Sequence, residues 1–134
     1  HEINFDTFDS LVVPADSSAA AEIQKKLPDT FVVKAFNTTF AATLASGLVG
    51  GKEKATVLLA SDSEDAKKKV GEALEGSPLA VKDAGSLKRA RELEAMGFLQ
   101  ITLAARGQFG WTDGFAVIGK IGNVHSGWPI CRND

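Results

Sequence analysis

The chain changes from a strand pattern to a helix pattern within ten residues, FVVKAFNTTF, which run from Phe31 to Phe40. The β-branched and aromatic residues at the start of this stretch follow a breaker cluster, so we expect a strand over Thr30–Ala35. Leu44 and Leu48 then continue from Phe40 at every fourth position, which is helix spacing. A short polar corner therefore joins the strand to the helix. In open α/β sheets, ligands bind outside such carboxyl ends of strands.

The same alternation recurs along the chain. Four short apolar runs predict strands, each followed by a helical pattern, at Leu11–Val13, Thr30–Ala35, Thr56–Ala60 and Leu79–Lys82. Such alternation predicts an α/β fold with a mainly parallel sheet and helices on both faces. We expect this domain to extend over residues 1–119, with residues 120–134 as a separate tail.

Three of the helices can be described from their sequence patterns. The first covers Ala19–Leu27, with Ala20, Ile23 and Leu27 on one face. Ser61 and Glu64 have the spacing of a capping box and are expected to begin the third helix. The lysines at 67–69 are expected on the exposed face of that helix. The longest helix opens at Gly85-Ser86 and has a core-facing stripe made of Leu87, Ala90, Leu93, Gly97 and Ile101.

Length and composition indicate one ordinary globular domain. The chain has 134 residues, of which 44% are hydrophobic and 24% are charged. A net charge of -2 argues against a nucleic-acid partner or an anionic membrane surface. No apolar run approaches the roughly 20 residues that cross a bilayer, and the polar start predicts no signal peptide. The single cysteine, Cys131, favours a reducing, cytoplasmic compartment.

Two separated motifs carry a resemblance to a known family. Val32–Thr38 reads VVKAFNT, and Asp83–Leu87 reads DAGSL, followed by ARELE at Ala90–Glu94. Together they resemble the NADP oxidoreductases that depend on a deazaflavin coenzyme, and also the related cytosolic domain of six-transmembrane ferric reductases. The resemblance runs from about Phe8 to Phe115. It implies a Rossmann-like fold and hydride transfer between NADP(H) and a second redox carrier such as a deazaflavin.

One part of the family pattern is missing. Its members begin with a strand, a G-x-G-x-x-G loop and a helix, whereas Gly47, Gly50 and Gly51 fit neither that motif nor a P-loop. We therefore interpret these glycines as a helix end and a turn. The resemblance implies the carboxyl-terminal portion of such an enzyme, without the half that holds the pyrophosphate.

Asn37 is the principal candidate for cofactor binding, because an amide can donate and accept hydrogen bonds at once. Asparagine is also a common helix cap, and spacing alone favours a capping role before the Phe40 helix. The resemblance implies instead that the Ala-Phe-Asn corner lies against the nicotinamide end of the cofactor. The cofactor-binding residues that it implies are Lys34, Ala35, Phe36, Asn37 and Thr38.

A second group, Arg91, Glu92 and Glu94, has two interpretations. Local ion pairs on an exposed helix would explain it, and the resemblance also places this helix beside the substrate cleft. His1 and His125 have no carboxylate or cysteine at ligand spacing, so no metal site is predicted. No catalytic constellation is visible, which fits hydride transfer, because that reaction needs no protein nucleophile.

A non-catalytic module is the rival to the oxidoreductase hypothesis. If the first half of the sheet is absent, one strand has an unpaired edge, and such edges favour pairing with another chain. This predicts a homodimer or larger assembly burying more than about 1,000 Å² in total, or completion of the fold by the missing amino-terminal half. On the rival hypothesis, assembly would be the chain's whole function.

Overall fold

The computed structural model describes residues 16–119, which form a mixed α/β unit. Its elements, in chain order, are α1 (Ala19–Lys26), α2 (Ala41–Ser46), β1 (Leu48–Val49), β2 (Glu53–Lys54), β3 (Thr56–Ala60), α3 (Glu64–Ala73), β4 (Ala80–Gly85), the 3-10 turn η1 (Leu87–Arg89) and α4 (Ala90–Ala105). The strand predicted at residues 11–13 and the tail from residue 120 lie outside the described residues. The domain boundary at residue 119 therefore stays a prediction.

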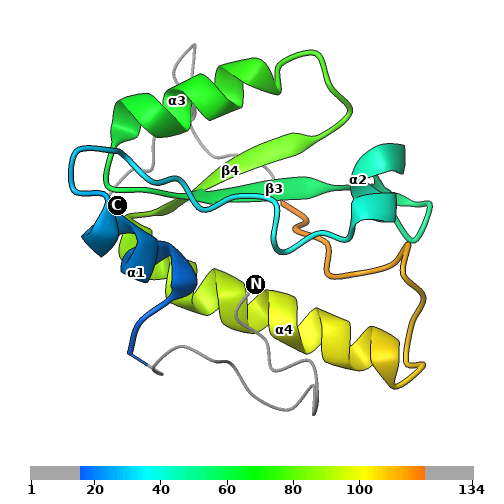
Figure 1. The fold of residues 1–134 in the computed structure, drawn as a ribbon. Helices are drawn as coiled ribbons and strands as arrows, with labels where there is room; N and C mark the ends of the chain where they lie inside the picture. The colour runs from blue at the N-terminus through cyan, green and yellow to red at the C-terminus, as the bar shows by residue number, and fades with distance from the viewer. Residues whose placement is uncertain (1–15, 120–134) are drawn as a thin grey trace.

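A small parallel sheet is at the centre of the fold. β3 and β4 pair in parallel, from Thr56 opposite Ala80 to Ala60 opposite Gly85, with a shift in register after Leu59. All but one of the β3 residues are buried, as expected for a strand covered on both faces. α3 lies on one side of this sheet, and α1 and α4 lie on the other (Figure 1). This confirms the predicted fold class, although β1 and β2 form a separate antiparallel hairpin.

The strand predicted over residues 30–35 is wrong. The segment runs beside β3, but only Lys34 pairs with it, through an antiparallel bridge to Ala60 with N···O distances of 2.8 and 3.0 Å. At Val32, side chains form hydrogen bonds with the backbone groups that would otherwise pair with a neighbouring strand. Its N–H donates to Gln24 Oε1 at 3.0 Å, and its carbonyl accepts from Ser61 Oγ at 2.8 Å.

The helix built on Phe40 is shorter than its spacing predicted. α2 ends at Gly47, which has a left-handed φ of 74°, so Leu48 belongs to β1 and not to the helix. No other residue fits easily at Gly47, because a Cβ there would lie 2.7 Å from the ring of Pro78. The glycines at 47, 50 and 51 thus form the helix end and turn that the sequence predicted.

α1 has the predicted position but buries less than predicted. Ser18 caps it by accepting from Ala21 N at 3.0 Å, and Ala20 is buried. Ile23 and Leu27, which were predicted on the same face as Ala20, are each about half exposed. A core-facing stripe therefore exists only at the start of this helix.

The predicted cap of α3 is wrong by two residues. Ser63 is the N-cap and accepts from Ala66 N at 3.1 Å. Ser61 continues from β3, is buried, and uses its hydroxyl to bind Val32 O and Ser63 N. The capping-box spacing failed because the first serine of the pattern is already part of the strand end.

α4 begins later than the predicted opening at Gly85-Ser86, because Gly85 ends β4 and η1 precedes Ala90. Most of the predicted stripe is buried. Beyond it, residues 107–119 form an irregular cover without helix or strand. This cover brings Trp111 and Phe109 against Phe40, with ring centroids 5.1 and 6.3 Å apart. Within residues 16–119, no helix is long and apolar enough to cross a membrane.

Candidate functional site

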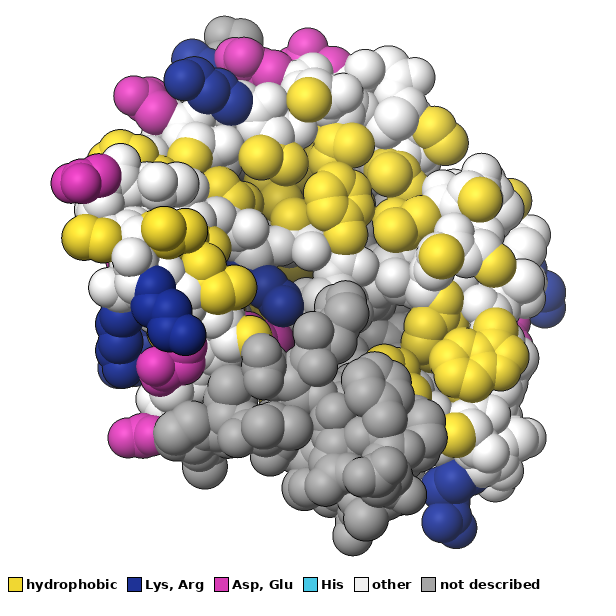
Figure 2. Space-filling view, in the orientation of Figure 1, with side chains coloured by type: hydrophobic (Ala, Val, Ile, Leu, Met, Phe, Trp, Pro, Cys, Tyr) yellow, Lys and Arg dark blue, Asp and Glu magenta, His cyan; other side chains and the backbone are white. Residues whose placement is uncertain are grey.

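A cavity of about 610 Å³ lies between the 32–41 segment, α1 and α4. Its volume falls within the range of small-molecule sites, roughly 300–1,000 Å³. The residues that line it are mainly apolar and include Ala19, Ala20, Ile23, Val32, Val33, Lys34, Ala35, Phe36, Asn37, Thr39, Phe40, Ala41, Glu94, Gly97, Phe98 and Ile101. Hydrophobic side chains also gather in several groups on the face shown in Figure 2, where charged ones lie mostly at the periphery.

The corner at Phe36 and Asn37 has an unusual backbone. Phe36 has a φ of 66°, a left-handed conformation that is rare for a bulky residue and costs roughly 1–3 kcal/mol. Asn37 Nδ2 donates to the carbonyl of Leu93 at 2.7 Å, which ties the corner to α4. Asn37 Oδ1 is buried and has no hydrogen-bond partner in the described part of the chain. Asn37 does not cap α2, because Phe40 occupies that position without a side-chain hydrogen bond.

Gly97 lets this corner pack directly against α4. A Cβ at Gly97 would lie 2.7 Å from the carbonyl oxygen of Asn37 and 3.0 Å from its Nδ2. Real Cβ atoms do not approach a backbone oxygen so closely. The absence of a side chain at this position is therefore a condition for the corner's placement.

Lys34 and Glu94 form an ion pair at the cavity, with 3.6 Å between Lys34 Nζ and Glu94 Oε2. Glu94 also accepts from Ala19 N at 2.7 Å and from Ala20 N at 3.3 Å, at the N-terminus of α1. Its side chain is only 8% exposed. The interpretation of Glu94 as part of a local surface ion pair is therefore wrong, because all of these contacts reach other segments.

The structure brings together four of the five predicted cofactor-binding residues: Lys34, Ala35, Phe36 and Asn37 all line the cavity. Thr38 is not among the lining residues; it is 6% exposed, and its carbonyl accepts from Gln100 Nε2 at 2.7 Å.

Sequence reasoning missed Gln100 altogether. It is 2% exposed and also accepts from Phe115 N through Oε1 at 3.1 Å. The available signal was a glutamine between Leu99 and Ile101, in the mainly apolar second half of α4. Gln100 holds the corner and the 107–119 cover in place from one side chain.

Arg91 and Glu92 agree with the surface interpretation. Glu92 pairs with Arg89 at 2.8 Å and with Arg91 at 3.5 Å, and all three side chains are more than a third exposed. Ion pairs of this kind contribute little to stability. Neither Arg91 nor Glu92 is among the residues that line the cavity.

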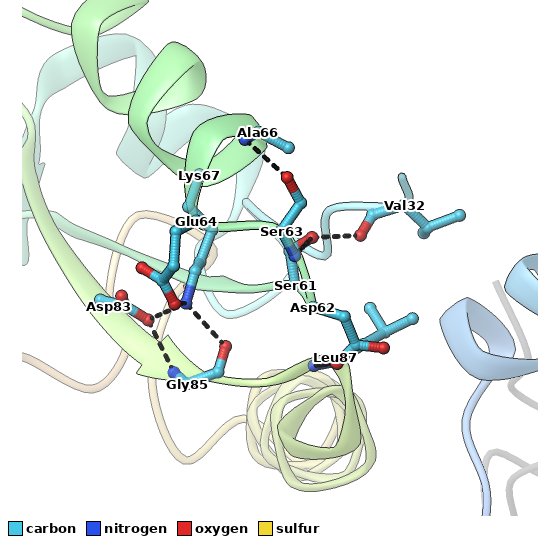
Figure 3. Close-up of polar contacts among 10 residues, drawn as sticks. All are labelled: Val32, Ser61, Asp62, Ser63, Glu64, Ala66, Lys67, Asp83, Gly85 and Leu87. Atoms are coloured by element: carbon cyan, nitrogen blue, oxygen red, sulfur yellow. Dashed lines mark hydrogen bonds and ion pairs between the residues drawn. The ribbon is translucent and has the colours of Figure 1, made fainter. Parts of the chain in front are cut away.

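Lys67 contradicts the expectation that the lysine run is a solvated surface. Its side chain is 1% exposed and reaches between Asp83 and Glu64, each 2.9 Å from Nζ (Figure 3). It also donates to the carbonyl of Gly85 at 3.2 Å. Burial by itself lowers the pKa of Lys67, but the hydrogen bonds and the attraction of both carboxylates outweigh it and raise that pKa. The ammonium thus joins α3 to the end of β4.

This pKa shift predicts a loss of stability at alkaline pH. Because the pKa of Lys67 is raised in the folded chain above its ordinary 10.5, its contribution is complete below that value. The contribution disappears as the pH rises through the folded-state pKa. The difference in unfolding free energy between wild type and Lys67→Met should therefore be constant from about pH 7 to 9 and shrink above about pH 10.5. Urea titrations across this range measure it, and a difference that grows with pH would contradict the shift.

The fold belongs to the Rossmann-like α/β class, and a comparison with solved structures supports this. The chain is similar to a protein from Arthrobacter sp. FB24 described as an F420-dependent NADP-reductase, with a TM-score of 0.68 and 24% identity. The match covers 82% of this chain and 50% of that one, so this chain spans half the length of the similar protein. At this identity the likeness establishes the fold alone. No protein-family model and no curated protein matches the sequence.

Proposed function

We propose that this chain is part of an NADP(H)-dependent oxidoreductase and that its cavity receives the nicotinamide end of the cofactor. The observation that carries the proposal is the place of the Lys34–Asn37 motif. Six of the seven residues of the first motif that resembles the deazaflavin-dependent family, Val32 to Asn37, line a ligand-sized cavity. The cavity also has a strained backbone at Phe36 and, at Asn37, a buried amide oxygen without a partner among residues 16–119, features that concentrate at functional sites.

The lining residues fit one end of a dinucleotide better than the other. Ala35, Phe36 and Phe98 offer apolar surface to a planar ring, and Asn37 and Lys34 offer polar groups beside it. The sequence has no glycine-rich turn that would hold a pyrophosphate against backbone N–H groups. The cofactor supplies the hydride when it is bound, and this chain's residues bind and orient the ring. We propose a deazaflavin as the second carrier, in line with the description of the similar Arthrobacter protein.

Measuring the binding of the whole cofactor and of its two parts tests this proposal. We expect the 134-residue chain to bind nicotinamide mononucleotide at about millimolar concentration. NADP(H) should bind with similar affinity, because its additional phosphates find no glycine-rich turn in this sequence to bind them. Adenosine 2′,5′-bisphosphate should not bind measurably. Ligand-observed NMR at fixed protein concentration measures all three.

Asn37→Ala should weaken binding of the mononucleotide by roughly three- to tenfold, since one or two hydrogen bonds are lost. The control is Gln108→Ala, which removes an exposed amide that does not line the cavity. Stronger binding of the adenosine ligand would place the cofactor the other way round. Failure of every nucleotide to bind would favour the rival hypothesis of a non-catalytic module. Self-association stays a prediction, which light scattering tests.

A further inference from the structure

The charged groups of the cavity suggest which substituent its ligand carries. Among the described lining residues, Lys34 and Glu94 are the only charged ones, and they form an ion pair with each other. Their charges cancel at this wall of the cavity. An ammonium alone at the same place would attract an anion, and a carboxylate alone would repel one.

The carboxylate of Glu94 is held in place by hydrogen bonds from another helix. The first N–H groups of α1, at Ala19 and Ala20, point to its two carboxylate oxygens, and a helix N-terminus stabilises negative charge. With its side chain 8% exposed, Glu94 cannot swing into solvent to make room for another anion. Lys34 is less tightly held. Its Nζ is 3.6 Å from Glu94, beyond the 2.7–2.9 Å of a charge-assisted hydrogen bond.

We infer that the Lys34–Glu94 pair makes the cavity selective for a ring bearing a neutral carboxamide over one bearing a carboxylate. A carboxamide has an acceptor oxygen for the ammonium and N–H donors for acceptors such as the Glu94 carboxylate. A carboxylate has only acceptors and adds a second negative charge close to Glu94. Glu94 is thus a specificity-determining residue that acts on the ligand's charge and also positions Lys34. This inference rests on the proposed function, since it assumes a nicotinamide-type ligand.

Two mononucleotides that differ at one group test the inference. Nicotinamide mononucleotide and nicotinic acid mononucleotide share the ribose and the phosphate and differ only in carboxamide against carboxylate. For the wild-type chain we expect the nicotinamide form to bind about tenfold more tightly or better, a difference of about 1.4 kcal/mol. Glu94→Gln should reduce this ratio to about one or reverse it. Lys34→Met should raise the ratio instead, because it removes the cation and keeps the anion.

The opposite directions of the two variants separate charge selection from a structural role. Damage to the cavity would weaken both ligands together and leave their ratio unchanged. The control is Glu72→Gln, an exposed carboxylate on α3, across the sheet from α1 and α4, and it should leave the ratio unchanged (Figure 1). If Glu94→Gln does not fold, the wild-type ratio and Lys34→Met still decide the question.

Each outcome has a distinct meaning. Equal wild-type affinity for the two ligands would overturn the inference and leave the proposed function standing. A wild-type preference that neither variant alters would also overturn it, because the preference would then arise elsewhere. If neither ligand binds the wild-type chain, the proposed function fails and this inference fails with it.

Discussion

Replacing Lys67 by methionine should lower the free energy of unfolding by about 3–5 kcal/mol, the usual cost of removing one partner from a buried ion pair. Methionine keeps most of the side-chain volume, so the loss reflects charge and not an empty space. The ammonium lies between Asp83, whose side chain is 4% exposed, and Glu64, which is 76% exposed. Water can solvate the exposed carboxylate of Glu64 when the ammonium is removed. Most of the loss in unfolding free energy should therefore come from the interaction with buried Asp83. Urea unfolding at neutral pH measures the change.

The neighbouring lysine gives a matched control for this prediction. Lys68 lies in the same helix and is exposed, so Lys68→Met should change stability by no more than about 0.5 kcal/mol. The double variant Lys67→Met with Asp83→Asn should recover part of the loss, because it removes both members of the buried pair. A loss below about 1 kcal/mol for Lys67→Met would mean that the pair behaves like a surface ion pair.

The sequence predicted the central elements well where one pattern dominated. β3 is a continuous apolar run, and α4 has a long stripe with helical spacing; both were found in the structure. The failures came where local patterns compete with tertiary partners. The apolar segment at 31–33 predicts a strand, but Gln24 on α1 and Ser61 after β3 bind the backbone groups of Val32. No local rule identifies such partners.

Lys67 illustrates the same limit for charge. Three consecutive lysines after two acidic residues are most often a solvated helix face, and Lys68 and Lys69 are exposed. The angular position of Lys67 on α3 points its side chain towards the end of β4, where Asp83 lies. Its burial depends on the packing of α3 against the sheet. Spacing along the chain does not contain that information.

The candidate site was only partly accessible from sequence. The corner residues Lys34 to Asn37 were found through the family resemblance, and they line one cavity. Glu94 and Gly97 were named from the sequence, as a member of the second candidate group and of the core-facing stripe. Their contacts with α1 and with the corner came only from the structure, because they depend on what α4 faces. From the sequence alone, Gly97 in the stripe is interpreted only as a small core residue. Its contact with the Asn37 carbonyl appears once the corner is placed over the helix.

Gly97→Ala should therefore disturb both the fold and the cavity. In an exposed helix this change would gain about 1 kcal/mol, since alanine is the better helix former. Here the new Cβ would lie 2.7 Å from the Asn37 carbonyl oxygen, which belongs to backbone and cannot rotate away like the end of a long side chain. Overpacking of this kind costs about 1–3 kcal/mol, so we expect a net loss of stability of up to about 2 kcal/mol.

Gly97→Ala should also weaken ligand binding. To relieve the contact, the corner must move away from α4, which lengthens the 2.7 Å hydrogen bond from Asn37 Nδ2 to Leu93 and changes the cavity wall. We expect binding of nicotinamide mononucleotide to fall roughly tenfold, equivalent to about 1.4 kcal/mol. Gly119→Ala is the control, because a Cβ there would meet nothing within 4 Å. If Gly97→Ala is more stable than wild type and binds the mononucleotide normally, the corner does not depend on close contact with α4. The cavity would then be too deformable to act as a preorganised site for the ring.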